Sequence, residues 1–151
     1  MDGEAHYLFQ GLGDATREKI LASGHEESHS PGDVIFRENK PALNFYILNS
    51  GRLRLRAGQR PLLAHVACSV GDVIGWSSLV GNPTYSASAE CMTAARVLRI
   101  PKQVLDEILA EDPVSGMHFF KHLTALVGQR LVRSYLSPVA WDEERPICPA
   151  A

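Results

Sequence analysis

The spacing of apolar residues changes twice along the chain and divides it into three parts. Four apolar residues near the start fit one face of a helix: Leu8, Leu12, Ile20 and Leu21. Asp14 can cap a helix over residues 15–22, and Gly24 can end that helix. Between His25 and Ile100, Gly, Pro and Asn separate short apolar runs, as in antiparallel sandwiches and barrels, and from Pro101 the helical spacing returns. The pattern predicts a mainly β fold of about eight short strands, with a short helix before them and two helices after them.

The clearest strand pattern lies in residues 44–57, where Gly51 interrupts the alternation. Leu53 and Leu55 alternate with arginines at positions 52, 54 and 56, so we expect the leucines to point inward and the arginines to face water. Gly58 and Gln59 predict a turn, and residues 61–68 predict the return strand of a hairpin. Residues 86–91 and 95–100 predict two further strands.

Two helices are expected at the end, because Pro101 and the pair Asp112–Pro113 place proline where a helix begins. They cover residues 102–110 and 113–136. One apolar stripe on the second helix contains Val114, Met117, Phe120, Leu123, Val127, Leu131 and Tyr135. A second stripe contains Phe119, Leu126, Val132 and Leu136. Because one stripe suffices for packing on the same domain, we predict that Phe119 and Leu126 contact a second copy of the chain; alternatively, they widen the internal contact.

The composition and two incomplete motifs make several classes of function improbable. The chain has 151 residues, of which 45% are hydrophobic and 21% charged, enough for one core without disulfides or a metal. A net charge of −2 and a pI near 6.3 do not suit a nucleic-acid-binding domain, and no apolar run approaches the roughly 20 residues that cross a bilayer. His118 and His122 lack a third metal ligand, and Leu79 replaces the second glycine of a hydrolase motif at Ser77. We therefore expect a cytoplasmic, non-catalytic protein with no metal, membrane or direct nucleic-acid partner.

Residues 71–87 form the candidate binding segment. Gly75, followed by Ser77, Ser78 and Leu79 within a strand region, predicts one short helical turn whose free amides point the same way. Gly75 allows close approach to the backbone, and the serine hydroxyls, with that of Ser86, can donate hydrogen bonds. The segment predicts either an anion-binding turn or a capped surface turn between two strands.

Four segments resemble the cyclic-nucleotide-binding domain family and occur in the family's order. This is the type of domain found in the catabolite activator protein and in the regulatory subunit of protein kinase A. The four segments are LFQGL at 8–12, PGDVIFREN at 31–39, NFYILNSGRLRL at 44–55 and VGDVIG at 70–75. The resemblance implies an eight-stranded jelly roll (a double-stranded β-helix), a phosphate-binding turn at Gly75–Leu79 and a long last helix that pairs two subunits. We expect the domain to span residues 1–136 and residues 137–151 to form a tail that is too short for a helix-turn-helix.

Two positions depart from the family's pattern. Members that bind cAMP carry a glutamate that holds the ribose hydroxyl and an arginine that pairs with the cyclic phosphate, whereas Trp76 and Tyr85 stand here. These rings can stack on a planar or apolar ligand, or they can fill the pocket. Arg130 on the last helix is a candidate for a compensating charge. The predicted ligand-binding residues are Gly75, Trp76, Ser77, Ser78, Leu79, Tyr85, Ser86, Ala87 and Arg130.

Two functions stay open. The first is a homodimeric regulatory sensor that holds cAMP or cGMP weakly, or a different small effector, at residues 75–87 and moves the helices from Pro101 onward. The second is a ligand-free dimerisation and interaction module whose pocket Trp76 and Tyr85 fill.

Overall fold

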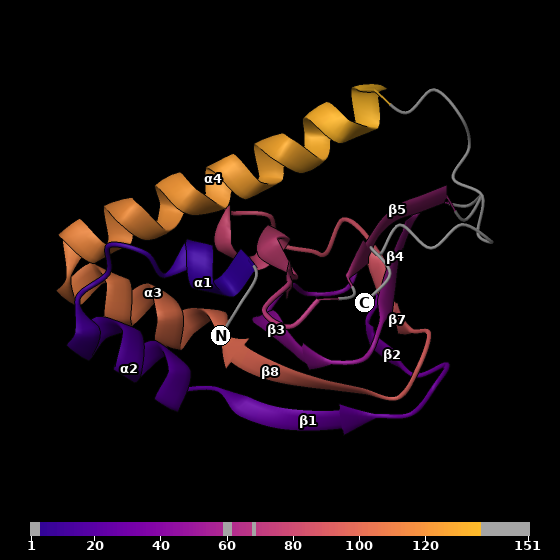
Figure 1. Cartoon of the computed structure of the whole chain (residues 1–151), viewed down its shortest axis with the longest axis horizontal. Helices are drawn as coiled ribbons and strands as arrows, with labels where there is room; N and C mark the ends of the chain where they lie inside the picture. Colours follow the sequence, from indigo (N-terminus) through magenta and orange to yellow (C-terminus); the bar gives the residue numbers. More distant parts are fainter. Residues whose placement is uncertain (1–3, 59–61, 68, 137–151) are drawn as a thin grey trace.

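Two four-stranded antiparallel sheets pack face to face in the computed structural model, which describes residues 4–58, 62–67 and 69–136 (Figure 1). The first sheet has the order β1 (His25–His29), β8 (Ala95–Pro101), β3 (Asn44–Ser50), β6 (Val73–Ile74). The second has the order β2 (Val34–Phe36), β7 (Ser88–Cys91), β4 (Leu53–Ala57), β5 (Leu62–Ala67). The mainly β class and the eight strands are therefore as predicted.

Helices cover the outer face of the first sheet. They are α1 (Glu4–Leu8), α2 (Asp14–Ala22), a 3-10 turn η1 (Trp76–Leu79), α3 (Lys102–Glu111) and α4 (Pro113–Leu136). In Figure 1, α4 runs along the top of the molecule from above α3 toward β5. Within the described part of the chain, none of these helices is long and apolar enough to cross a membrane.

The start of the chain contains the predicted helix, as α2, and a second helix, α1, that was not predicted. Gly11 has a φ of +79°, in the left-handed region, so the chain turns there between α1 and α2. The residue that caps α2 is Gly13, and Asp14 lies inside the first turn, where a carboxylate favours the positive end of the helix dipole. The predicted tail at 137–151 lies outside the described residues.

The predicted break at Gly51 has a clear steric cause. Gly51 has a φ of +93°, and a Cβ there would lie 2.4 Å from the carbonyl oxygen of Ala94. The chain turns at this point between β3 and β4, so no larger residue fits. Beyond it Leu53 and Leu55 are buried, as predicted, whereas the three arginines that alternate with them are only half-exposed and Arg54 pairs with Glu90.

The core has two parts because β3 is buried on both faces. Phe45 and Ile47 point toward the helices and pack with Phe119 and Leu123 of α4. Tyr46 and Leu48 point the other way, into the space between the two sheets. A strand that is apolar on both faces in this way is typical of a sheet covered on both sides.

Candidate functional site

Gly75 forms the sharp turn that the sequence predicted between β6 and η1. Its φ of 78° and ψ of 23° are left-handed, and a Cβ would lie 3.0 Å from the carbonyl oxygen of Asn44 and 3.2 Å from the Tyr46 ring. Ser78 closes the turn, since its hydroxyl donates to the Gly75 carbonyl at 2.8 Å. Residues 75–79 therefore form one short, tightly packed turn held against β3.

The hydroxyls of Ser77 and Ser86 connect the two ends of the candidate segment. Their Oγ atoms are 2.9 Å apart, and Ser77 is buried. One of the two hydroxyls donates to the other, so each has a hydrogen-bond partner within the chain. This bond brings the segment's beginning and end together without a ligand.

Tyr85 fills the centre of the predicted pocket. Its ring is 4% exposed and stacks on Phe36, with the ring centroids 4.1 Å apart. The Tyr85 hydroxyl donates to the carbonyl oxygen of Asn44 at 2.8 Å and accepts from the Asn44 N–H at 3.1 Å. Burial raises the pKa of this phenol. Where the family places a guanidinium, this chain thus places a neutral ring that pairs with the backbone of β3.

The space that remains at the segment is a cavity of about 30 Å³. It is lined by Phe36, Leu55, Gly75, Trp76, Ser77, Tyr85, Ser86 and Ala87. A water molecule needs roughly 10–15 Å³, whereas sites for small molecules measure about 300–1,000 Å³. The cavity can therefore hold water but not a nucleotide.

Six of the nine predicted ligand-binding residues line this cavity, and three do not. Ser78 and Leu79 are buried on the other side of the turn, where Leu79 joins the core under the helices. Trp76 is half-buried and contributes to both places, since it packs against that core and lines the cavity. The prediction of a turn was right, but the turn directs two of its side chains into the protein.

Arg130 is the third predicted residue that does not line the cavity, because its side chain pairs with groups outside the cavity. Its guanidinium donates to a Glu4 carboxylate oxygen at 2.5 Å and to the Val73 carbonyl at 2.7 Å, and the same Glu4 oxygen accepts from the Val73 N–H at 3.0 Å. The Arg130 side chain is 14% exposed. The predicted role as a compensating charge in the pocket is thus wrong: Arg130 ties α4 to α1 and to β6.

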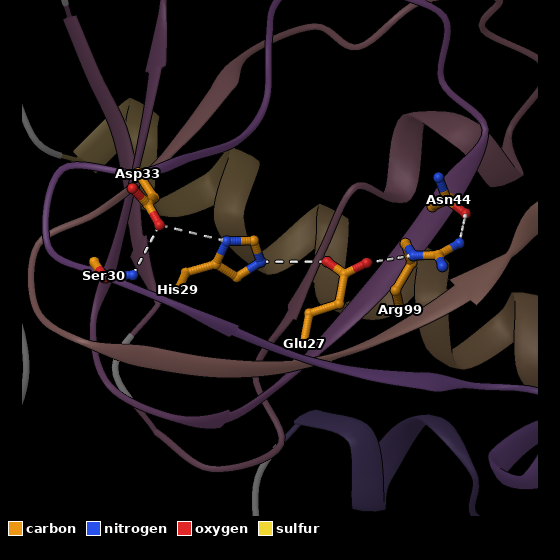
Figure 2. Close-up of polar contacts among 6 residues, drawn as sticks. All are labelled: Glu27, His29, Ser30, Asp33, Asn44 and Arg99. Carbon is orange, nitrogen blue, oxygen red and sulfur yellow. Dashed lines mark hydrogen bonds and ion pairs between the residues drawn. The ribbon is translucent and has the colours of Figure 1, made fainter.

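Asn44 connects Tyr85 to a polar network on the face of the first sheet that also carries Tyr46. Figure 2 shows this network from Asn44 to Asp33. Its side-chain oxygen accepts from Arg99 at 3.3 Å, and the Arg99 Nε donates to Glu27 at 2.6 Å. Glu27 lies 3.2 Å from His29, whose other ring nitrogen lies 3.9 Å from Asp33. Neither Asn44 nor Phe36 was predicted as part of the site, because nothing in a strand pattern indicates which backbone groups a distant side chain reaches.

The predicted interface residues on α4 are also buried inside the chain. Phe119 is 0% and Leu126 6% exposed, and both pack in the core under the helices. Contact with a second copy through these two residues is therefore wrong, and the alternative interpretation holds. Other apolar residues of α4 are between 51% and 77% exposed: Val114, Met117, Leu131, Val132, Tyr135 and Leu136. We call these six residues the outer face of α4.

The titratable residues form no metal site in the described ranges. No three His, Cys, Asp or Glu side chains there are grouped as metal ligands. His118 and His122 lie with their ring centroids 6.3 Å apart, and the His122 ring lies 4.7 Å from that of Tyr7. These histidines pack between helices.

Comparisons with known sequences agree on one family. A family model described as "Cyclic nucleotide-binding domain" matches residues 26–112. A cAMP-dependent protein kinase regulatory subunit from Hypocrea atroviridis is 29% identical over 110 residues, which cover 73% of this chain and 23% of that protein. The same subunit from Colletotrichum orbiculare is 29% identical over 111 residues, 73% of this chain and 27% of that protein. The chain spans about a quarter of the length of these curated relatives.

Solved structures share the fold. A protein from Geobacter metallireducens that is described as cyclic nucleotide-binding is 28% identical, with a TM-score of 0.72 over 82% of this chain and 91% of that one. The Thermus thermophilus catabolite activator protein is 22% identical, with a TM-score of 0.69 over 85% of this chain and 60% of that one. The sensor domain of the transcriptional regulator DNR from Pseudomonas aeruginosa is 21% identical, with a TM-score of 0.69 over 85% and 88%.

Proposed function

The chain belongs to the cyclic nucleotide-binding domain family, and within it we propose a cytoplasmic, non-catalytic regulatory module that works as a homodimer with its nucleotide pocket closed. This is the second of the two functions that the sequence left open. The single observation that carries it is the ring of Tyr85, which occupies the pocket and leaves about 30 Å³.

The charges of the segment support the same conclusion. A buried phosphate needs a charged partner, because otherwise it keeps its desolvation cost of several kcal/mol without a compensating pair. Where the family's arginine stands, Tyr85 offers a hydroxyl that Asn44 already engages, and Arg130 is paired with Glu4. At about 1.4 kcal/mol per tenfold change in affinity, the missing partner alone weakens cAMP by several orders of magnitude.

The outer face of α4 supports a role in protein contact. Exposed apolar side chains that cluster on a surface often mark an interaction site, and four of the six lie together in the last two turns of the helix: Leu131, Val132, Tyr135 and Leu136. In the middle of this helix Gly128 adds no bulk, and a Cβ at that position would meet nothing within 4 Å. A partner helix can therefore approach closely at Gly128 while Leu131 and Tyr135, on the turns that follow, pack beside it. A second copy of the chain offers the same surface, so the helices can pair with two-fold symmetry.

The names of related proteins agree with a regulatory role. Relatives include regulatory subunits of a protein kinase, and neighbours in structure include the sensor domain of a transcriptional regulator. Catalytic activity is not implied by any of these names. We propose that the module acts on a partner protein without contacting nucleic acid itself.

Calorimetry and light scattering test the two halves of this proposal. We expect no heat of binding and no shift in Tm with cAMP or cGMP at millimolar concentration. The protein used must unfold in one cooperative transition, which shows that it is folded. We expect the mass of a dimer by light scattering at micromolar concentration. Saturable nucleotide binding would overturn the closed pocket, and a monomer at all concentrations would overturn the role of α4.

A further inference from the structure

A recess of about 390 Å³ lies between α1 and α2, away from the closed pocket. Its floor is apolar: Phe9 and Leu12 are 3% and 7% exposed, and Leu21 is half-buried. The volume falls in the range of about 300–1,000 Å³ that small-molecule sites occupy. Since the floor residues belong to the main core, the recess has a firm base that is formed before any ligand arrives.

The rim of the recess carries the guanidinium of Arg17, and none of the residues that line the recess is a carboxylate. Arg17 and His6 are both exposed and line it. Arg17 uses one terminal nitrogen to contact Asp14 at 3.0 Å, and the Asp14 side chain is 86% exposed. A guanidinium has five N–H donors, so Arg17 can bind a second carboxylate or exchange the exposed one. An apolar floor beside a guanidinium suits a molecule with an aliphatic body and an anionic head.

The recess also rests on the beginning of α4. A Cβ on Gly11, which lines it, would lie 3.3 Å from the His118 ring. The backbone N–H of Gly13 donates to the Ser115 hydroxyl at 3.0 Å. An occupant of the recess would therefore fix the position of the 9–13 turn against α4.

We propose that this recess binds an aliphatic carboxylate, with the head group on Arg17 and the chain along Phe9, Leu12 and Leu21. This site is independent of the proposed function, because it shares no residue with the closed pocket or with the outer face of α4. Its occupant stabilises the contact between the N-terminal turn and α4.

Titration with decanoate tests the site. Binding is measured by calorimetry and by the shifts of amide signals in NMR spectra, and the decanoate concentration is kept below that at which micelles form. We expect saturable shifts at Gly11 and Gly13 and none at Gly75. Octanoate, which is two methylenes shorter, should bind about tenfold more weakly, and acetate should not bind. Absence of saturable decanoate binding, or shifts centred on Gly75, would overturn the proposal.

Four variants separate the head group from the chain. Arg17→Gln should weaken decanoate about tenfold, whereas Lys19→Gln removes a charge from the same helix outside the recess and should change nothing. Asp14→Asn should strengthen binding, because it frees Arg17 from its present partner. Leu21→Asn should weaken binding by removing part of the floor.

Two outcomes would overturn the carboxylate site, because they would show that the recess binds a different kind of molecule. If 1-decanol binds as tightly as decanoate, the head group is not recognised. If Leu21→Asn changes the oligomeric state without any ligand, a second copy of the chain covers the recess. Neither outcome bears on nucleotide titration of the unaltered protein, so failure here is distinct from failure of the proposed function.

Discussion

Replacing Tyr85 with phenylalanine removes one hydroxyl and keeps the ring stacked on Phe36. That hydroxyl makes two hydrogen bonds to the backbone of Asn44, at 2.8 and 3.1 Å, and a third with the hydroxyl of Tyr46. A net hydrogen bond contributes about 0.5–1.5 kcal/mol, and a buried polar group left without a partner costs about 1–3 kcal/mol. Because Asn44 is half-buried, water can replace part of the loss. We expect Tyr85→Phe to lower the free energy of unfolding by about 2 kcal/mol.

Urea unfolding measures this change directly. In a chain of this length, 1 kcal/mol corresponds to about 2–4 °C in Tm, so the variant should also melt about 4–8 °C lower. The control is Tyr135→Phe, which removes a hydroxyl from a residue that is 72% exposed and should change stability by less than about 0.5 kcal/mol. If the two variants are equally stable, the Tyr85 hydroxyl does not hold the ring in the pocket and the reasoning is refuted.

Three further predictions concern the helices. Hydrogen bonds from neighbouring hydroxyls lower the pKa of Asp112 below its ordinary value of 3.8, so its contribution to stability is present above pH 3.8 and disappears as the pH falls through the lowered pKa. Urea unfolding between pH 6 and 2 should show this loss in the unaltered protein and a flatter profile in Asp112→Asn. Leu131→Glu should convert the dimer to a monomer in light scattering, whereas Gln129→Glu, which adds the same charge beside the outer face, should leave it intact. Arg130→Gln should destabilise the fold by about 1.5–3 kcal/mol in urea, because a largely buried carboxylate on α1 loses its charged partner; an unchanged midpoint would contradict this.

Local patterns predicted most of the fold. The alternation around Leu53, the break at Gly51 and the proline at 113 each depend on residues that are neighbours in sequence, and each element forms where it was expected. The short helix α1 was missed, because its five residues are too few for an apolar pattern to repeat. Local steric and hydrophobic rules thus suffice where the deciding contacts are local.

The closed pocket depends on contacts that are distant in sequence. Trp76 and Tyr85 were known to replace charged residues, but the sequence left open whether they line the pocket or fill it. The answer comes from Phe36, which stacks on Tyr85 across 49 positions, and from Asn44, which pairs with its hydroxyl. A buried ring with a hydrogen-bonded hydroxyl is stable without a ligand, and this is why the pocket stays closed.

The outer face of α4 was misassigned for a related reason. The buried side of this helix includes Gly116, where a Cβ would lie 3.2 Å from the Leu109 carbonyl, and Arg130, which pairs with Glu4. A pattern built from apolar residues counts neither glycine nor arginine as inward-facing, so it places the helix in the wrong rotation. With Gly116 and Arg130 directed inward, Phe119 and Leu126 follow them into the core, and the apolar residues on the opposite side are left exposed. An intramolecular contact that uses small and charged residues therefore leaves apolar surface for a partner, and this is the physical basis of the proposed pairing through α4.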